Sequence, residues 1–370
     1  QVGRGVERDD VRAVAWYRRG AEQGDPAAQY NLGWMYQQAR GVARDEIEAI
    51  HWYRKSAKQG YAAADNNLGW MFQNGLGVHQ DDHRAVRYYR RGAERGDAAA
   101  QYNLGWMYQE GRGVDKDDER AVYWYRESAQ QGYASALNNL GWMYQEGRGV
   151  ERDDREAVNW YRQAAKKGDE VAQNNLGWMY QEGRGVKPSD RRAVRWYRKA
   201  ALRGYAPAQK NIGEMYQAGR GVKESDVRAV SWYRRAAGQG YAAAMNNLGL
   251  MFQAGRGVPE DERRAVHWYR KAAARGDAGA MNNLGSMYQE GRGVPPDDAE
   301  AVYWYRRAAH LGDPAAMNNL GWMHQEGRGV RCSHLLAYRW YLRAAKLDHA
   351  AAMNNLGWMY QEGLGTPQDD

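Results

Sequence analysis

The chain has 370 residues and a formal net charge of +8, with 16 Trp and 27 Tyr but only 2 Phe and 1 Cys. Its aromatic content of 12% excludes a disordered chain, its mean hydropathy of −0.92 and its lack of a long apolar run exclude a membrane span, and its single Cys excludes an intrachain disulfide framework. The modest charge allows acidic partners without requiring them. Such a biased composition indicates one short unit copied many times.

The copied unit is visible as a Leu-Gly pair that recurs every 36 residues without insertion, with Ile212-Gly213 as the one variant. Residues 1–10 also align with residues 361–370, so the chain holds ten periods and ten further residues. We expect the array to continue in a longer polypeptide on one or both sides. An engineered consensus array is the alternative, but irregular residues such as Cys332 favour natural duplication.

Each period predicts two helices, and residues 61–96 serve as the example. The first helix is expected over residues 62–73, because Ala64, Leu68, Met71 and Phe72 are spaced to form one apolar stripe. It is expected to end at Gly75, where glycine can adopt the left-handed conformation of a C-terminal cap.

A Gly-x-Gly-Val loop follows, and Asp81 and Asp82 stand where they can cap a second helix and complement its dipole. In this second helix Ala85, Tyr88-Tyr89 and Gly92-Ala93 form the apolar stripe, and Arg residues form a solvated face. We place the nine Trp of the second-helix Trp-Tyr pairs in the core as well. They are Trp16, Trp52, Trp124, Trp160, Trp196, Trp232, Trp268, Trp304 and Trp340.

One such hairpin cannot bury both of its faces, whereas stacked copies can share a continuous core, which predicts an α/α solenoid. The glycine inside each first helix, such as Gly69, costs about 1 kcal/mol relative to Ala. Its presence in every copy predicts a close approach of helices, with a Tyr or Trp of the next helix lying over the missing side chain.

The run N-L-G-x-M-Y-Q-x-G-x-G-V-x-x-D, followed by A-V-x-W-Y-R-x-A-A-x-x-G, closely resembles the Sel-one-like repeat (SLR) family, which is related to the tetratricopeptide repeat. The resemblance covers essentially the whole chain. It implies an all-α, right-handed α/α superhelical solenoid of about ten 36-residue helix-turn-helix repeats. It also implies a scaffold or adaptor that binds other proteins. Some secreted members staple each repeat with a cysteine pair, which this chain lacks.

In the family's phasing the chain is a single array over residues 1–370. Half repeats cover 1–24 and 349–370, and full repeats cover 25–60, 61–96, 97–132, 133–168, 169–204, 205–240, 241–276, 277–312 and 313–348.

The candidate binding residues lie on the first helices, which line the concave face in tetratricopeptide-like solenoids. If Leu68 and Met71 face the core, then Asn66-Asn67, Trp70 and Gln73 share another side of the helix, which we call the Asn-Trp-Gln face. Across the copies, the candidate residues are Asn66, Asn67, Trp70, Gln73, Trp106, Gln109, Asn138, Trp142, Gln145, Asn174, Trp178, Gln181, Glu214, Leu250, Ser286, Trp322 and Trp358.

Ladders of amide side chains can donate to and accept from an extended peptide backbone, and Trp supplies the rigid apolar area that dominates binding hot spots. The alternative is structural, because neighbouring copies of these side chains can pack on each other, and Asn67 can bond the loop between repeats. Three consecutive copies replace the Trp by Glu214, Leu250 and Ser286. They represent either drift or a specificity patch within residues 205–312.

Other motifs point to little chemistry. The loop arginines Arg4, Arg40, Arg112, Arg148, Arg184, Arg220, Arg256, Arg292 and Arg328 form a row that Leu76 and Leu364 interrupt. We expect neighbouring Asp residues, such as Asp153-Asp154 after Arg148, to neutralise this row, which argues against nucleic-acid binding. His79 and His83, like Cys332 and His334, occur in one copy only. We therefore expect no metal, no cofactor and no enzymatic activity.

The sequence thus favours a non-enzymatic scaffold that binds a protein or an extended peptide. Two alternatives stay open at this point. Trp and amide side chains also suit glycans or peptidoglycan, and the matching phase of the two ends allows end-to-end self-association. The sequence assigns no cellular compartment.

Overall fold

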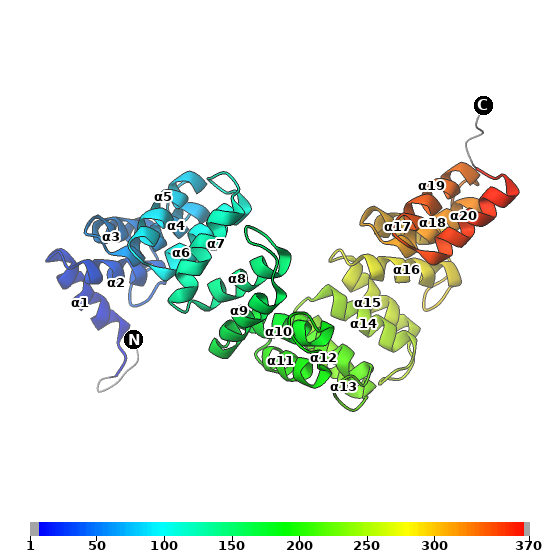
Figure 1. Ribbon diagram of the computed structural model, residues 1–370, viewed down its shortest axis with the longest axis horizontal. Helices are drawn as coiled ribbons and strands as arrows, with labels where there is room; N and C mark the ends of the chain where they lie inside the picture. The colour runs from blue at the N-terminus through cyan, green and yellow to red at the C-terminus, as the bar shows by residue number, and fades with distance from the viewer. Residues whose placement is uncertain (1–6, 366–370) are drawn as a thin grey trace. The chain divides into compact units, whose positions relative to one another are not determined.

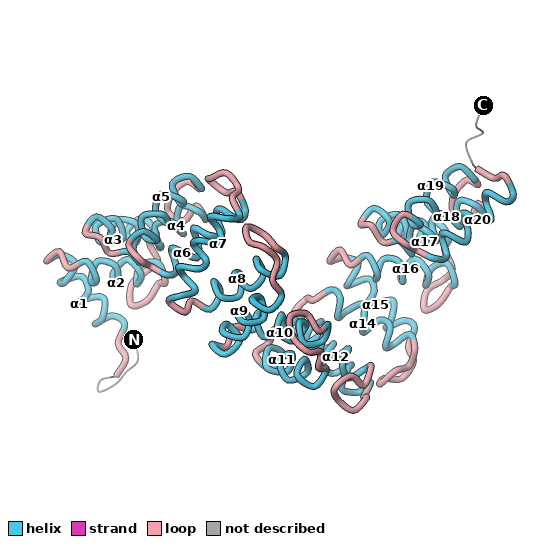
Figure 2. Tube along the Cα trace, viewed as in Figure 1, coloured by secondary structure: helices cyan, strands magenta, loops and turns pink. Residues whose placement is uncertain are grey.

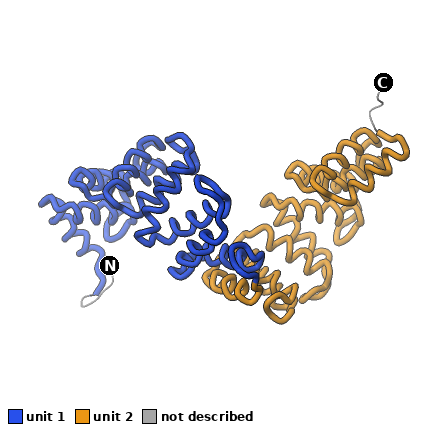
Figure 3. Tube along the Cα trace, viewed as in Figure 1, with its two compact units in different colours: residues 1–188 blue, residues 189–370 orange. Residues whose placement is uncertain are grey.

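The computed structural model describes residues 7–365, and in this part of the chain it contains twenty α-helices and no strand (Figures 1 and 2). The chain divides into two compact units, residues 1–188 and residues 189–370 (Figure 3). Ten helices lie in each unit. None of the described helices is long and apolar enough to cross a membrane.

The helices have nearly uniform lengths. Unit 1 contains α1 (Asp10–Glu22), α2 (Pro26–Gln37), α3 (Glu46–Lys58), α4 (Ala62–Asn74), α5 (Asp82–Glu94), α6 (Ala98–Glu110), α7 (Asp118–Gln130), α8 (Ala134–Glu146), α9 (Asp154–Lys167) and α10 (Glu170–Glu182). Unit 2 contains α11 (Asp190–Leu202), α12 (Ala206–Gln217), α13 (Asp226–Gly238), α14 (Ala242–Gln253), α15 (Glu262–Ala273), α16 (Ala278–Glu290), α17 (Asp298–His310), α18 (Pro314–Glu326), α19 (His334–Ala345) and α20 (Ala350–Glu362).

Within each unit, consecutive helices pack against each other, as α4 packs on α5 and α5 on α6 in unit 1. The even-numbered helices are the first helices of the repeats, and the odd-numbered helices are the second helices. This alternation confirms the predicted all-α array of helix pairs. The predicted first helix over residues 62–73 differs from α4 by one residue.

The predicted helix ends are also confirmed. Gly75 follows α4 in the left-handed conformation, with a φ of 67°, and its N–H donates to the Met71 carbonyl. Asp81 precedes α5, and its side chain accepts a hydrogen bond from the backbone N–H of Arg84. The sequence therefore sets both helix ends through residues that satisfy free backbone groups.

The glycine inside each first helix allows the close helix approach that the sequence predicts. A Cβ atom on Gly69 would lie 2.6 Å from Cδ1 of Tyr89, which is fully buried. Burial raises the pKa of the Tyr89 hydroxyl well above its ordinary value. The same Gly–Tyr packing recurs at Gly141 with Tyr161 and at Gly285 with Tyr305, so it packs the first helix of a repeat on its second helix in both units.

We expected the second-helix Trp residues to lie in the core, but most of them do not. In the described part of the chain only Trp52 among these nine is buried, whereas Trp16 is 68% exposed and the other seven are half-buried. In eight of the nine pairs the Tyr that follows the Trp is buried and takes the core position instead, and Tyr17 is the exception. Many of these Trp rings are covered by a cation one turn later, as Lys199 covers Trp196 at 4.5 Å from the ring centroid.

Candidate functional site

The Asn-Trp-Gln face is built from consecutive positions of the first helices. Its Trp side chains are only partly covered, and Trp70 is 40% exposed on α4. The rings of Trp106, Trp142 and Trp178 are half-buried on α6, α8 and α10. The described Trp residues of this face therefore offer apolar surface to a ligand while being held by their neighbours.

The Gln side chains of this face are fixed by the buried tyrosines. The Tyr89 hydroxyl donates to Gln73 Oε1 at 2.6 Å, and the Tyr161 hydroxyl donates to Gln145 Oε1 at 2.9 Å. The equivalent bond recurs in most copies. It joins Tyr53 to Gln37, Tyr125 to Gln109, Tyr233 to Gln217, Tyr269 to Gln253, Tyr305 to Gln289 and Tyr341 to Gln325. Because the amide oxygen is engaged, the NH2 group is the part of each Gln that is directed away from the tyrosine.

A neighbouring carboxylate determines what this NH2 group does. In four copies the Glu that follows the Gln accepts from Nε2, as Glu110 does from Gln109 at 3.0 Å and Glu146 from Gln145 at 2.9 Å. Asn74 follows Gln73, and Ala254 follows Gln253, so no such carboxylate stands next to these amides. The face thus carries an ordered row of amide donors with local variation in charge.

The Asn pairs bond adjacent repeats to each other. The second Asn of one copy donates to the first Asn of the preceding copy, as Asn103 does to Asn66 at 2.8 Å and Asn175 to Asn138 at 3.1 Å. In unit 2 the same bond joins Asn283 to Asn246, Asn319 to Asn282 and Asn355 to Asn318. These amides therefore have a structural role, and each keeps further hydrogen-bonding capacity for a ligand.

The Trp rings are braced by the loop arginines. The guanidinium of Arg148 lies 4.9 Å from the centroid of the Trp142 ring, and it also pairs with Asp118 of the preceding repeat at 2.6 Å. Similar contacts place Arg40 over Trp34, Arg112 over Trp106, Arg184 over Trp178 and Arg328 over Trp322. Each such Trp is therefore held in place by contacts within the chain.

The partner of each loop Arg differs from the sequence expectation. We expected Asp153-Asp154 to neutralise Arg148, but Arg148 pairs with Asp118, 30 residues earlier, and Asp154 pairs with Arg184. The same 30-residue spacing joins Arg40 to Asp10, Arg112 to Asp82, Arg220 to Asp190, Arg256 to Asp226, Arg292 to Glu262 and Arg328 to Asp298. The row is neutralised between repeats, and Arg4 lies outside the described residues.

The loop glycines explain this pairing. Gly113 has a φ of 65°, and a Cβ there would collide with the carbonyl of Asp82, so the loop lies directly on the start of α5. Arg112 is thereby placed beside the Asp82 carboxylate, at 2.9 Å. In the same geometry Arg184 holds the pKa of Asp154 below its ordinary value through a hydrogen bond and charge attraction.

Comparison with known proteins assigns the architecture. The family model described as Sel1 repeat matches residues 1–25, 26–61, 62–97, 98–133, 134–169, 171–205, 206–241, 242–277, 278–313, 314–349 and 350–370. The chain belongs to the Sel1 repeat family.

Two solved Sel1 repeat structures agree with this assignment. The protein c5321, a protective antigen of uropathogenic Escherichia coli strains with an SLR fold, is 36% identical, with a TM-score of 0.75 over 99% of this chain and 79% of that one. A Sel1 repeat protein from Oxalobacter formigenes is 33% identical, with a TM-score of 0.64 over 87% of this chain and 98% of that one. No curated protein matches the chain in sequence.

These matches confirm the predicted family and α/α solenoid fold. Sel1 repeat proteins generally mediate protein–protein interactions and are generally non-enzymatic scaffolds. The binding roles of the individual side chains on the Asn-Trp-Gln face stay predictions.

The three Sel1 repeats without a first-helix Trp are chemically distinct. Glu214 pairs with Lys210 at 2.6 Å and accepts from Asn247 at 3.4 Å, while Leu250 is 43% exposed. Ser286 donates to Glu290 at 2.7 Å. An ion pair, an aliphatic group and a hydroxyl thus replace three aromatic rings along the first helices of unit 2.

The isolated His and Cys residues take part in local contacts. His83 Nδ1 lies 2.9 Å from the Gly113 carbonyl oxygen, and the exposed Cys332 donates weakly to the Gln325 carbonyl at 3.2 Å. Within residues 7–365 no group of three or more His, Cys, Asp or Glu side chains is arranged to hold a metal ion.

Sequence reasoning missed the Arg–Asp pairing across repeats, although a signal was present. Where the loop Arg is replaced by Leu364, the residue 30 positions earlier is His334 instead of an acid, whereas Leu76 still has an acid there, Glu46. Tyr–Gln bonding had no comparable signal, because both residues are nearly invariant among the copies.

Proposed function

We propose that the Asn-Trp-Gln face binds an extended segment of a partner protein. The observation that carries this proposal is the pre-organisation of the face, in which Arg148 and Asp118 brace Trp142 and the Tyr161 hydroxyl fixes Gln145. Side chains that are already ordered lose little conformational entropy on binding, which favours affinity.

The spacing of the repeats suits an extended chain. Neighbouring packed helices lie about 8–10 Å apart, and an extended peptide advances about 3.3 Å per residue, so one repeat corresponds to about three peptide residues. A segment of about seven residues would span Trp106, Trp142 and Trp178, which are two repeat steps apart. Its apolar side chains would contact the Trp rings, and its carbonyl groups would accept from amide N–H groups.

The test is a paired screen of the whole chain against a random peptide library and a glycan array. We expect peptides with apolar residues at about every third position to be enriched by the wild-type chain, and to be lost with the double variant Trp142→Ala/Trp178→Ala. Binding of glycans with no peptide enrichment would refute the proposal and support a carbohydrate ligand. Size measurement over a concentration series tests the separate prediction of end-to-end association.

A further inference from the structure

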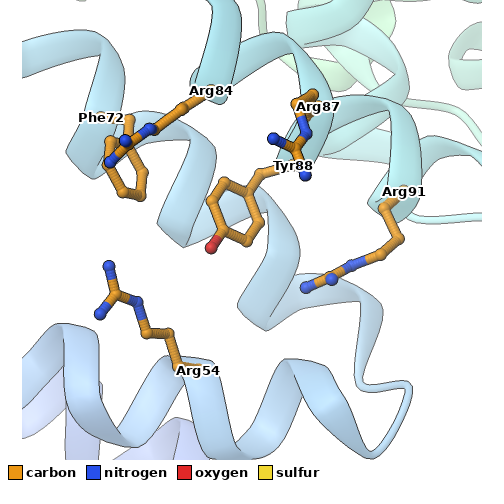
Figure 4. Close-up of a pocket in the computed structure, with 6 residues that line it drawn as sticks. All are labelled: Arg54, Phe72, Arg84, Arg87, Tyr88 and Arg91. Atoms are coloured by element: carbon orange, nitrogen blue, oxygen red, sulfur yellow. The ribbon is translucent and has the colours of Figure 1, made fainter. Parts of the chain in front are cut away.

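A strongly basic pocket lies in unit 1, separate from the side chains of the Asn-Trp-Gln face (Figure 4). Its volume is about 350 Å³. Side chains from three consecutive helices line it: Arg54 from α3, Phe72 from α4, and Arg84, Arg87, Tyr88 and Arg91 from α5. Figure 4 shows the arginine side chains arranged around the rings of Tyr88 and Phe72.

The pocket lies where Phe72 replaces the Tyr found in most copies. Phe252 is the same substitution, but His267 and Trp268 stand there in place of Arg87 and Tyr88. In five other copies the Arg at the position of Arg54 donates to a Tyr hydroxyl 18 residues later. These pairs are Arg18–Tyr36, Arg90–Tyr108, Arg126–Tyr144, Arg198–Tyr216 and Arg270–Tyr288, at 2.7–3.2 Å. Phe72 lacks the oxygen, so this pairing is lost at Arg54.

The next copy shows what normally occupies this space. There the Tyr108 hydroxyl accepts from Arg90 at 3.0 Å and from Arg120 at 3.5 Å, so one oxygen lies between two guanidinium groups. At the pocket the corresponding arginines are Arg54 and Arg84, and Phe72 has no hydroxyl to place between them. An oxygen of a ligand can take that place.

The charges of the pocket are only partly balanced. Arg84 pairs with Asp81 at 3.2 Å, and Arg91 pairs with the buried Asp65, its Nε lying 2.6 Å from Oδ1. For the other two arginines, Arg54 and Arg87, the described residues provide no hydrogen bond or ion pair. Two uncompensated positive charges therefore face the same pocket.

The aromatic side chains give the pocket an apolar wall. The rings of Phe72 and Tyr88 are stacked, with centroids 5.4 Å apart and an interplanar angle of 13°. Arg84 lies 5.7 Å from the centroid of the Phe72 ring, and Arg91 lies 5.2 Å from that of Tyr88. These contacts hold both guanidinium groups at the edge of the pocket.

We propose that this pocket binds a phosphate monoester, with the phosphoryl group in the place left between Arg54 and Arg84, Arg87 supplying further positive charge, and the organic part against Tyr88. Guanidinium groups match phosphate oxygens in planar, two-pronged hydrogen bonds. A phosphate monoester carries about −1.5 to −2 charges at pH 7, which matches the two uncompensated arginines, whereas a carboxylate would match one. The volume leaves room for more than the phosphoryl group alone.

The test is calorimetric titration of the whole chain with phenyl phosphate. We expect Arg54→Gln/Arg87→Gln to lower the affinity at least tenfold. The matched control is Arg306→Gln/Arg339→Gln, which removes the same two charges at the same repeat positions, where His324 and Leu336 replace Phe72 and Arg84. Equal loss in both double variants would show that net charge alone attracts the anion, and would overturn the proposal.

A single substitution probes the pocket without removing a charge. Phe72→Tyr restores the hydroxyl found in most copies, so Arg54 should pair with it, and we expect a several-fold loss of phenyl phosphate affinity with unchanged helical circular dichroism. Unchanged affinity in this variant would contradict the assigned role of Phe72.

Two further ligands test whether the pocket selects a phosphoryl group and whether that group comes from a small ester or from a phosphorylated protein. Phenylacetate, which presents a carboxylate, should bind at least fivefold more weakly than phenyl phosphate, and equal binding would refute selectivity for a phosphoryl group. A phosphotyrosine peptide that binds more tightly than phenyl phosphate would identify a phosphorylated protein as the source, and equal affinities would identify recognition of the small ester itself. This pocket is independent of peptide binding on the Asn-Trp-Gln face, so either can fail alone.

Discussion

Two regions of the array, one in each unit, share a scaffold but differ at one position of each first helix. The first helices of unit 1 carry Trp106, Trp142 and Trp178, while three first helices of unit 2 carry Glu214, Leu250 and Ser286 at the same position. Both regions nevertheless keep the Gly–Tyr packing, the Tyr–Gln bond and the ion pair across repeats. The scaffold is therefore complete without the Trp, and this argues that the Trp serves binding.

The largest expected loss of stability comes from filling the space over a helix glycine. A Cβ on Gly141 would lie 2.8 Å from Cδ1 of Tyr161, and one on Gly285 would lie 2.6 Å from Cε1 of Tyr305. We expect Gly141→Ala and Gly285→Ala each to lower the free energy of unfolding by about 1–3 kcal/mol, measured by urea denaturation.

The control for both variants is Gly357→Ala, because beyond the adjacent residues and backbone of its own helix no atom lies within 4 Å of the added Cβ there. Alanine favours the helix over glycine by about 1 kcal/mol, so this variant should be neutral or stabilised. A loss confined to Gly141→Ala would break the comparison, since it would show that the two regions do not share one scaffold.

A smaller effect should separate the ion pair from the ring contact. Arg148 pairs with Asp118 and covers Trp142, whereas Arg256 pairs with Asp226 in a region where Leu250 replaces the Trp. We expect Arg256→Gln to cost about 0.5 kcal/mol of unfolding free energy and Arg148→Gln about 1 kcal/mol, because the latter also loses a cation–π contact. Equal costs in denaturation would show that the Trp142 contact contributes nothing to the fold.

The smallest expected effect depends on pH. Arg184 keeps the pKa of Asp154 in the folded chain below its ordinary value of 3.8, so this carboxylate stabilises the fold above that pH and loses its contribution as the pH falls. At pH 7 the free energy of unfolding of the wild type should exceed that of Asp154→Asn by less than about 1 kcal/mol, because the Asp154–Arg184 pair is partly solvated. Thermal unfolding of both proteins at a series of decreasing pH values should show this difference disappear as Asp154 becomes protonated.

Asp169 provides a control of opposite sign. Burial raises the pKa of its carboxyl in the folded chain, so ionisation opposes folding as the pH rises. The backbone N–H of Ala172 donates a capping hydrogen bond to Asp169, and an Asn side chain can accept the same bond. The stability of Asp169→Asn relative to wild type should therefore increase as the pH rises. The same sign for both variants would contradict the assigned environments.

Much of the fold could be predicted from the sequence, because local chemistry fixes it in every copy. Gly75 and Asp81 mark helix ends through backbone geometry and capping, and Gly69 marks the close packing of Tyr89. The partner of Arg148 could not be predicted by proximity in sequence, because the loop folds onto the preceding repeat. The second-helix Trp residues were misplaced, because the helical stripe does not show which of two adjacent aromatic rings faces inward.

The sequence allowed us to group the residues of the Asn-Trp-Gln face, but it did not reveal the basic pocket. The Asn-Trp-Gln face follows from helical periodicity, so its residues could be grouped by their spacing in the repeat. The basic pocket could not be recognised in this way, since it depends on an absent hydroxyl at Phe72 and on arginines from two different helices. The rarity of Phe, with 2 residues in the chain, was the available signal.

The most direct test of the binding face compares affinity and stability in the same samples. A peptide selected with the wild-type chain is titrated against Trp142→Ala/Trp178→Ala and against Leu250→Ala/Ser286→Ala as the matched control. We expect at least a tenfold loss of affinity for the Trp variant, less than a twofold change for the control, and cooperative unfolding in both. Equal affinity in the two variants would contradict the claim that the Trp rings form the binding surface.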